Sequence, residues 1–382
     1  MVRRFLAVTT AEAGSSAIAA PLFANVTATG AEDCSSWADA CTLATAITNA
    51  NSGDQVWAKS GTYGPIPLED GVKIIGGFAG TESSASQSDA SSNQTIIDGN
   101  GSRAVESEDD GGATVLRGFY IQGGDETGMD GGGGMRLDDS SALFVNAVFE
   151  DNLATYWGAA VSIRGTSSPH FINCIFRDNG WVDSEDNTNV KPLAGAAVFS
   201  YSGSPRFVNC LFHDNVAGEG TGLANTDRGL ATFVHCTTAD NTATARDGGA
   251  VHDRFGDVVI RNPVLWGNTA DEGLQIFSRG SSVTAVAYSD VQGGWGDAGN
   301  ISANPNFVNP SSDDCKIHHS SPCKEPGQNS SLPTDVGDLD WDGDSSETLP
   351  LDLGLNPRTR VCNVDMGAFE IQFGTCGAGG PE

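Results

Sequence analysis

Four aspartates alternate along one short segment of the chain, in the string DLDWDGD. Carboxylates at every second residue can converge on one hard cation, and the glycine among them permits a sharp turn. The string begins like an EF-hand loop, but position twelve is Leu349, and Glu347 fits only a different geometry. A solvated acidic loop is the alternative. The spacing predicts a Ca²⁺ site at Asp338, Asp340, Asp342 and Asp344.

A second group of reactive side chains occurs in the strings ANTDRG and VHDRFG, whose aspartates and arginines are each 26 residues apart. A fold that repeats at this period would bring them together on one wall. A polysaccharide lyase or glycoside hydrolase uses such groups for acid–base chemistry. However, no complete catalytic set accompanies them, and Asp–Arg pairs also form structural ion-pair ladders. If the chain is an enzyme, the expected groove residues are Asp227, Arg228, His252, Asp253 and Arg254.

A repeated element must position these groups. Strings such as FINCIFRDN and FVNCLFHDN recur, and the asparagines that close them are 27, 36, 26 and 27 residues apart. The longest spacing contains a polar insertion, residues 181–191, which we expect to protrude as a loop beside the groove. The closing residues are Asn152, Asn179, Asn215, Asn241 and Asn268.

Each repeat holds only short β-branched and aromatic runs with turn residues between them, which leaves no room for a ten-residue helix. The sequence therefore predicts an all-β fold, a right-handed parallel β-helix of about ten coils, roughly 45–50 Å long at ~4.8 Å per coil. Like residues should stack, with the asparagines forming a turn ladder. The residues expected in the buried stacks are Phe149, Phe176 and Phe212, and Ala147, Cys174, Cys210 and Cys236.

The repeats resemble two families of exported proteins. FEDN, FRDN and FHDN alternating with GAAV and GGAV are similar to the FxxN and GGA repeats of chlamydial polymorphic outer-membrane proteins. The resemblance to β-helix proteins with a choice-of-anchor Q domain is closer, through NPVLWGNTADEGLQIF, YSDVQGGWGDAGNISANPNFVNP, SPCKEPGQN and VDMGAFE in that order. It covers roughly residues 34–373 and implies a right-handed β-helix, export and residence at the cell surface, but no single activity. DLGLNPR departs from the DLDGNPR-like string common in that family.

The chain divides into four expected segments. Residues 1–24 hold two arginines, an apolar stretch and a small-residue end, which indicates a signal segment, with an N-terminal tail as the alternative. Residues 34–53 should hold a helix that caps the first coil. Residues 54–309 form the β-helix, and residues 310–376 an irregular C-terminal cap with the acidic loop and a closing strand.

Composition limits the partners. Aspartate and glutamate total 49 against 20 lysines and arginines, a formal charge of −29, which disfavours nucleic acid and anionic membranes. No later stretch is apolar enough for a membrane helix. Nine cysteines include three local pairs that we expect as disulfides of an exported protein: Cys34/Cys41, Cys315/Cys323 and Cys362/Cys376. The three cysteines of the repeat should remain thiols because their stacked Cβ vectors are parallel.

These observations lead to three hypotheses. The first is a non-catalytic protein, secreted or displayed at the cell surface, that uses its wall in a structural, adhesive or glycan-binding role, with an extracellular glycan or cell-surface component as partner. The second is a polysaccharide lyase or glycoside hydrolase. The third is a filament subunit that self-associates through its coil ends, which the two expected caps oppose.

Overall fold

The structure is a computed structural model. It describes residues 20–27, 30–180, 193–245, 247–280, 282–310, 314–358 and 363–372. The insertion at 181–191 and both Cys362 and Cys376 lie outside these residues.

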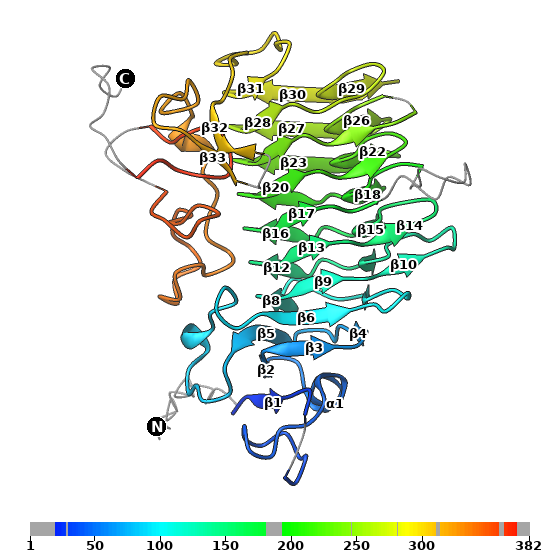
Figure 1. Cartoon of the computed structure of the whole chain (residues 1–382), viewed down its shortest axis with the longest axis vertical. Helices are drawn as coiled ribbons and strands as arrows, with labels where there is room; N and C mark the ends of the chain where they lie inside the picture. The colour runs from blue at the N-terminus through cyan, green and yellow to red at the C-terminus, as the bar shows by residue number, and fades with distance from the viewer. Residues whose placement is uncertain are drawn as a thin grey trace, which may run out of the picture.

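Three parallel sheets form the walls of a stacked coil (Figure 1). Wall A contains β1 (Leu22–Ala24), β2 (Gln55–Lys59), β5 (Lys73–Phe78), β8 (Val115–Arg117), β12 (Leu143–Val145), β16 (His170–Ile172), β19 (Arg206–Val208), β23 (Leu230–Val234), β27 (Asp257–Arg261) and β30 (Val283–Ala287). Wall B contains β3 (Gly61–Tyr63), β6 (Thr95–Asp98), β9 (Tyr120–Gln122), β13 (Val148–Glu150), β17 (Ile175–Arg177), β20 (Leu211–His213), β24 (Thr237–Ala239), β28 (Val264–Trp266) and β31 (Asp290–Val291). Wall C contains β4 (Ile66–Pro67), β7 (Val105–Glu108), β11 (Met135–Asp138), β15 (Val161–Arg164), β18 (Val198–Tyr201), β22 (Leu223–Thr226), β26 (Val251–Arg254) and β29 (Ile276–Arg279).

The remaining elements are short. Two-stranded parallel pairs join β10 (Asp125–Glu126) to β14 (Leu153–Ala154) and β21 (Val216–Ala217) to β25 (Thr242–Ala243). β32 (Phe307–Asn309) and β33 (Asp314–Ile317) pair antiparallel. The helical elements are α1 (Leu43–Asn49), η1 (Ala85–Gln87) and η3 (Asn329–Ser331).

The topology confirms the expected all-β parallel β-helix. Each strand of a wall pairs with the strand one coil before and one coil after it, as β13 pairs with β9 and β17. Ten strands stack in wall A, nine in wall B and eight in wall C. Complete three-strand coils therefore number at most eight, slightly fewer than the ten expected.

Phenylalanines stack along the interior as predicted. The rings of Phe149 and Phe176 are stacked with centroids 4.9 Å apart, and those of Phe176 and Phe212 with centroids 4.7 Å apart. A second column runs through Phe144, Phe171, Phe207 and Phe233. One coil has no interior of its own, so each coil buries these rings only against its neighbours. Cys174, Cys210 and Cys236 are buried thiols in the same core, as expected.

The predicted asparagine ladder is also present. The Nδ2 of Asn179 donates to the Oδ1 of Asn215 at 3.0 Å, and the Nδ2 of Asn215 donates to the Oδ1 of Asn241 at 2.8 Å. The same bond joins Asn152 to Asn179 and Asn241 to Asn268. All five side chains are buried, so the ladder satisfies polar groups that water does not reach.

The N-terminal end is closed by α1, which is shorter than the segment 34–53 in which it was expected. The side chain of Thr42 caps this helix by accepting a hydrogen bond from the backbone N–H of Thr45. A disulfide joins Cys34 to Cys41, as predicted. Strand β1 lies within the segment expected to be a signal and pairs with β2 in wall A.

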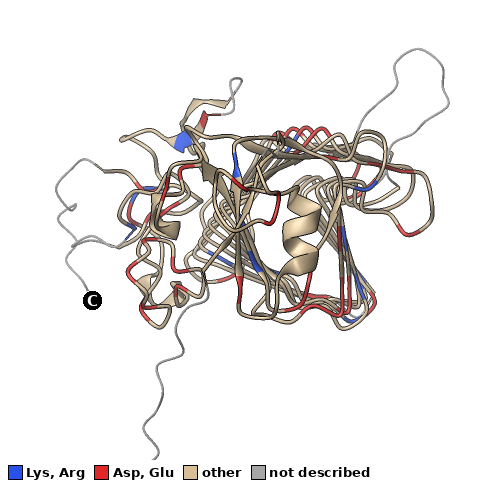
Figure 2. Cartoon of the chain, turned by 90° about the horizontal axis from the view of Figure 1, so that it is seen from below, with Lys and Arg blue, Asp and Glu red and all other residues tan. Residues whose placement is uncertain are grey.

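The C-terminal residues do not close the last coil. Residues 314–358 and 363–372, here called the C-terminal flank, lie along the side of the coils (Figures 1 and 2). The Nδ2 of Asn173 donates to the carbonyl of Asp352, and that of Asn262 donates to the carbonyl of Gln328. The string VDMGAFE adopts no strand. The reason is that turn side chains between walls A and B offer hydrogen bonds to the flank along several coils.

The expected disulfide between Cys315 and Cys323 is wrong. Both residues are buried, but the Cys323 thiol donates a hydrogen bond to the Oδ2 of Asp290, 3.1 Å from its Sγ. Burial, followed by the charge of Asp290, raises the pKa of this thiol. Closeness in sequence therefore did not identify the partner of Cys323.

Candidate functional site: a groove on wall C

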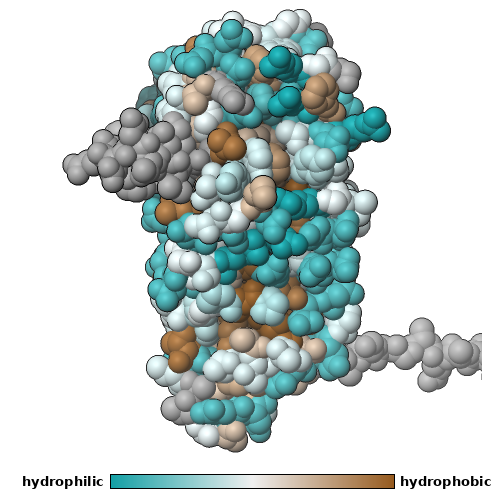
Figure 3. Space-filling model, turned by 90° about the vertical axis from the view of Figure 1, so that its right-hand side faces the viewer, coloured by the Kyte–Doolittle hydropathy of each residue, from teal (hydrophilic) through white to brown (hydrophobic). Residues whose placement is uncertain are grey.

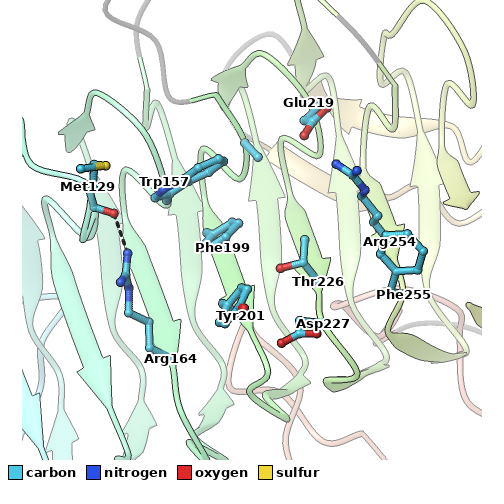
Figure 4. A pocket seen from close by; sticks show the side chains of 11 residues that line it. Met129, Trp157, Arg164, Phe199, Tyr201, Glu219, Thr226, Asp227, Arg254 and Phe255 are labelled. Atoms are coloured by element: carbon cyan, nitrogen blue, oxygen red, sulfur yellow. Dashed lines mark hydrogen bonds between the residues drawn. The ribbon is translucent and has the colours of Figure 1, made fainter. Parts of the chain in front are cut away.

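A groove of about 500 Å³ crosses wall C between the coil of β11 and the coil of β26 (Figure 4). Its lining combines aromatic, cationic and anionic side chains. The lining residues are Met129, Trp157, Arg164, Ala194, Phe199, Tyr201, Glu219, Thr226, Asp227, Arg254 and Phe255. The surrounding side of the molecule, which faces right in Figure 1, is largely hydrophilic, with small separate hydrophobic areas (Figure 3).

Strand alternation decides which residues reach the groove. Val198 at the start of β18 is buried in the core, so Tyr201, three residues later, points outward. The paired strands repeat this arrangement: Tyr201 lies beside Thr226, and Thr226 lies beside Arg254. One outward row of side chains therefore runs along the axis of the coil, with steps of ~4.8 Å.

The aromatic part of the groove is built on a stacked pair. The rings of Trp157 and Phe199 are stacked with centroids 4.8 Å apart. Phe199 is almost fully buried, whereas Tyr201 is 48% and Phe255 50% exposed. Large exposed aromatic rings leave apolar surface in contact with water. The wall thus presents a fixed aromatic platform with two further rings on its border.

The charged side chains of the groove are held in different ways. Arg164 donates to the backbone carbonyl of Met129 at 2.6 Å and forms a salt bridge with Asp130 at 3.2 Å. Arg254 forms no salt bridge with any described residue, and its guanidinium lies 5.5 Å from the ring centroid of Phe255. Arg254 therefore has donors to offer to a ligand in the groove.

Two of the five groove residues expected from the sequence line the groove. Asp227 and Arg254 do so, and the Oδ2 of Asp227 accepts a hydrogen bond from the hydroxyl of Ser202 at 3.1 Å. Arg228 is not among the lining residues; it occupies the turn after β22 with a φ of 68°. The repeat brought the two Asp–Arg strings into adjacent coils as expected, but their side chains diverge.

The other two expected residues are buried. His252 is 3% exposed and stacks on Phe277 with centroids 5.3 Å apart. Asp253 is 0% exposed and points inward, where its carboxylate accepts hydrogen bonds from Asn225 and Thr284, both at 3.2 Å. Burial raises the pKa of Asp253 to about 6. Neither side chain is positioned to meet a ligand on the outer wall.

The acidic loop that was expected to bind Ca²⁺ is divided. Carboxylate oxygens of three aspartates lie within 4.8 Å of one another: Asp338, Asp340 and Asp342. Asp344 is not part of this group, and its Oδ1 accepts hydrogen bonds from the backbone N–H and the hydroxyl of Ser346. The loop thus offers three of the four expected ligands to one point.

Sequence reasoning missed most of the groove. Trp157, Phe199, Tyr201 and Glu219 were not singled out, because they do not fall in the two Asp–Arg strings. A signal was available for Tyr201: it stands three residues after the apolar start of its strand, as Arg254 does in β26. Trp157 and Glu219 lie outside the wall strands, so no strand register could place them.

Comparison with known proteins supports the fold. A family model described as "Right handed beta helix region" matches residues 104–287, in agreement with the expected handedness. A comparison with curated proteins finds no match. Within the described residues, no helix is long and apolar enough to cross a bilayer.

Solved structures of similar architecture include two enzymes. Pectate lyase Pel9A is 13% identical, with a TM-score of 0.46 over 91% of this chain and 96% of that chain. The deglycosylated pectin methylesterase from Aspergillus niger is 13% identical, with a TM-score of 0.47 over 75% of this chain and 92% of that chain. At this level the similarity concerns the fold alone.

Proposed function

We propose that this β-helix is an exported protein that binds an extracellular oligosaccharide in the wall C groove. The observation that carries the proposal is the combination of the Trp157–Phe199 stack with the exposed ring of Tyr201 in one groove. A sugar ring has an apolar C–H face and a rim of hydroxyls. Such a ligand fits a site of aromatic surface with a few convergent polar groups.

The polar groups of the groove suit hydroxyls. Arg254 and Thr226 supply donors, and Asp227 and Glu219 supply acceptors. Because two arginines and two carboxylates line it, the groove has no net formal charge, although the chain carries −29. The field of the whole chain opposes a polyanionic ligand. We therefore favour a neutral or sparsely charged glycan.

The length of the groove fits a short chain of sugars. From β11 to β26 the wall advances four coils, which is roughly 19 Å at ~4.8 Å per coil. The axis of the outward row is also the direction in which an extended oligosaccharide would lie. A single small molecule would use only part of this surface.

Export is supported by two features. The Cys34–Cys41 disulfide is typical of proteins from oxidising compartments. The strings shared with choice-of-anchor Q proteins support secretion or display at the cell surface. Binding to a glycan of the matrix or of a neighbouring cell would then give the wall an adhesive role.

Catalysis is the second candidate function. Two carboxylates, Asp227 and Glu219, line the same groove, and a pair of carboxylates is what glycoside hydrolysis uses. In this reading the protein is a glycoside hydrolase or polysaccharide lyase whose acid–base residues are Asp227 and Glu219, and His252 and Asp253 are structural.

One experiment separates the two candidates. The purified protein is screened against a panel of oligosaccharides, with binding and the release of reducing ends or unsaturated products followed together. Binding without turnover supports the first candidate, whereas turnover that disappears in Asp227→Ala supports the second. If no oligosaccharide binds or reacts, both candidates are wrong.

A further inference from the structure

The base of the acidic loop is closed by backbone pairing. The N–H of Asp335 donates to the carbonyl of Glu347 at 2.9 Å, and the N–H of Leu349 donates to the carbonyl of Pro333 at 2.9 Å. These bonds bring two acidic residues twelve positions apart to the same level of the flank. A third, Asp340, folds back from the loop between them.

Asp335, Asp340 and Glu347 each direct one carboxylate oxygen to the same point, since these oxygens lie within 4.8 Å of one another. Asp335 is 0% exposed. Its Oδ2 accepts a hydrogen bond from the N–H of Leu339 at 2.7 Å, but its Oδ1 is buried without a hydrogen-bond partner. The Oε1 of Glu347 is likewise buried without a partner. An acceptor in this state costs free energy unless something binds to it.

No described side chain supplies the missing positive charge. The neighbouring cation is Arg117 of β8, which is itself buried. Its guanidinium donates to the backbone carbonyls of Gly337 and Asp338, both at 2.9 Å, and stacks 3.7 Å from the ring centroid of Trp341. Among the described residues its hydrogen bonds go to carbonyls and leave the three carboxylates unpaired.

We infer that Asp335, Asp340 and Glu347 bind a divalent cation of the calcium class. Hard oxygen ligands from separate segments, with water completing the shell, are what Ca²⁺ takes in proteins. The preference for Ca²⁺ over Mg²⁺ follows from the ligand set, because Mg²⁺ demands a small octahedral site and keeps most of its waters. The site shares Asp340 with the loop expected from the sequence, but adds two residues outside that string.

The cation would fasten the C-terminal flank to the coils. Asp335 and Glu347 stand at the base of the loop, and the carbonyls that Arg117 contacts stand directly after Asp335. Neutralising the carboxylates would hold the loop in the conformation that presents these carbonyls to β8. Ca²⁺ bound only by the folded form would also raise the midpoint of thermal unfolding.

The test uses the full chain freed of metal by EDTA and dialysed. Calorimetric titration with CaCl₂ should show one saturable site, and TbCl₃ should give luminescence sensitised by excitation of tryptophan, since Trp341 belongs to the loop. Asp335→Asn and Glu347→Gln should each weaken Ca²⁺ binding at least tenfold. Asp344→Asn, the matched control in the same loop, should bind as the wild type does.

Two variants keep the test decisive. If Asp335→Asn fails to fold, the partly exposed Glu347→Gln carries the comparison, with folding checked by circular dichroism. The inference is overturned if the wild type shows no saturable Ca²⁺ binding, or if Glu347→Gln binds as tightly as the wild type. Loss of binding in Asp344→Asn but not in Glu347→Gln would instead assign the ion to the aspartate loop and also overturn it.

Discussion

The Nδ2 of Asn215 lies 2.8 Å from the Oδ1 of Asn241 in the next coil, and the same amide also donates to the carbonyls of Phe176 and His213. One buried side chain thus satisfies groups in three successive coils. Since its Oδ1 accepts from the backbone N–H and the side chain of Asn179, no apolar side chain can replace it without leaving buried polar groups unpaired.

Asn215→Ala should therefore destabilise the protein strongly. We expect a loss of about 3 kcal/mol in the free energy of unfolding, because several buried donors and acceptors lose their partner at once. Denaturant unfolding followed by circular dichroism measures this loss. Asn51→Ala, in an exposed turn, is the control and should change stability by about 0.5 kcal/mol or less. Equal losses in both variants would contradict the structural role of the ladder.

Asp253 should make stability depend on pH. Burial raises its pKa to about 6, so between pH 4 and pH 6 the folded state holds a proton that the unfolded state has released. Stability contributed by this group therefore falls as the pH rises through that window, and the full cost is present above pH 6. From the shift, Asp253→Asn should gain up to about 3 kcal/mol at pH 8 and almost nothing at pH 4. A variant with the same pH profile as the wild type would show that Asp253 is not the titrating group.

Arg117 should hold the C-terminal flank against wall A. In Arg117→Ala the flank loses hydrogen bonds to the carbonyls of Gly337, Asp338 and Leu339. We expect faster proteolysis within residues 336–346 in calcium-free buffer, while the coils remain folded by circular dichroism. Mass spectrometry of the fragments locates the cut. Arg136→Ala in β11, whose arginine pairs with Asp138 away from the flank, is the control, and cutting at the same rate in both variants would contradict this role.

The repeat made the fold predictable. Five asparagines at nearly constant spacing determine the coil, and the coil in turn determines that Phe149, Phe176 and Phe212 stack. Each of these contacts joins residues in adjacent coils at equivalent positions, so a period read from the sequence is enough to find them. The flank has no period, which is why neither its position along the coils nor the partner of Cys323 followed from spacing.

The candidate site was only partly predictable for a different reason. The period brought Asp227 and Asp253 into adjacent coils, but it does not say which way a side chain points. Alternation along β26 places His252 and Arg254 on one face and Asp253 on the other. Applying the two-residue period of a strand together with the 26-residue period of the coil would have placed Asp253 inside.

The central claim is that the aromatic groove of wall C binds an oligosaccharide. The most direct measurement is the dissociation constant of the strongest ligand from the glycan panel for the wild type, Tyr201→Ala and Leu230→Ala. Tyr201 is 48% exposed in the groove, and Leu230 is 45% exposed on wall A outside it. We predict about tenfold weaker binding, ~1.4 kcal/mol, in Tyr201→Ala and no change in Leu230→Ala. Unchanged affinity in Tyr201→Ala, or an equal loss in both variants, would contradict the claim.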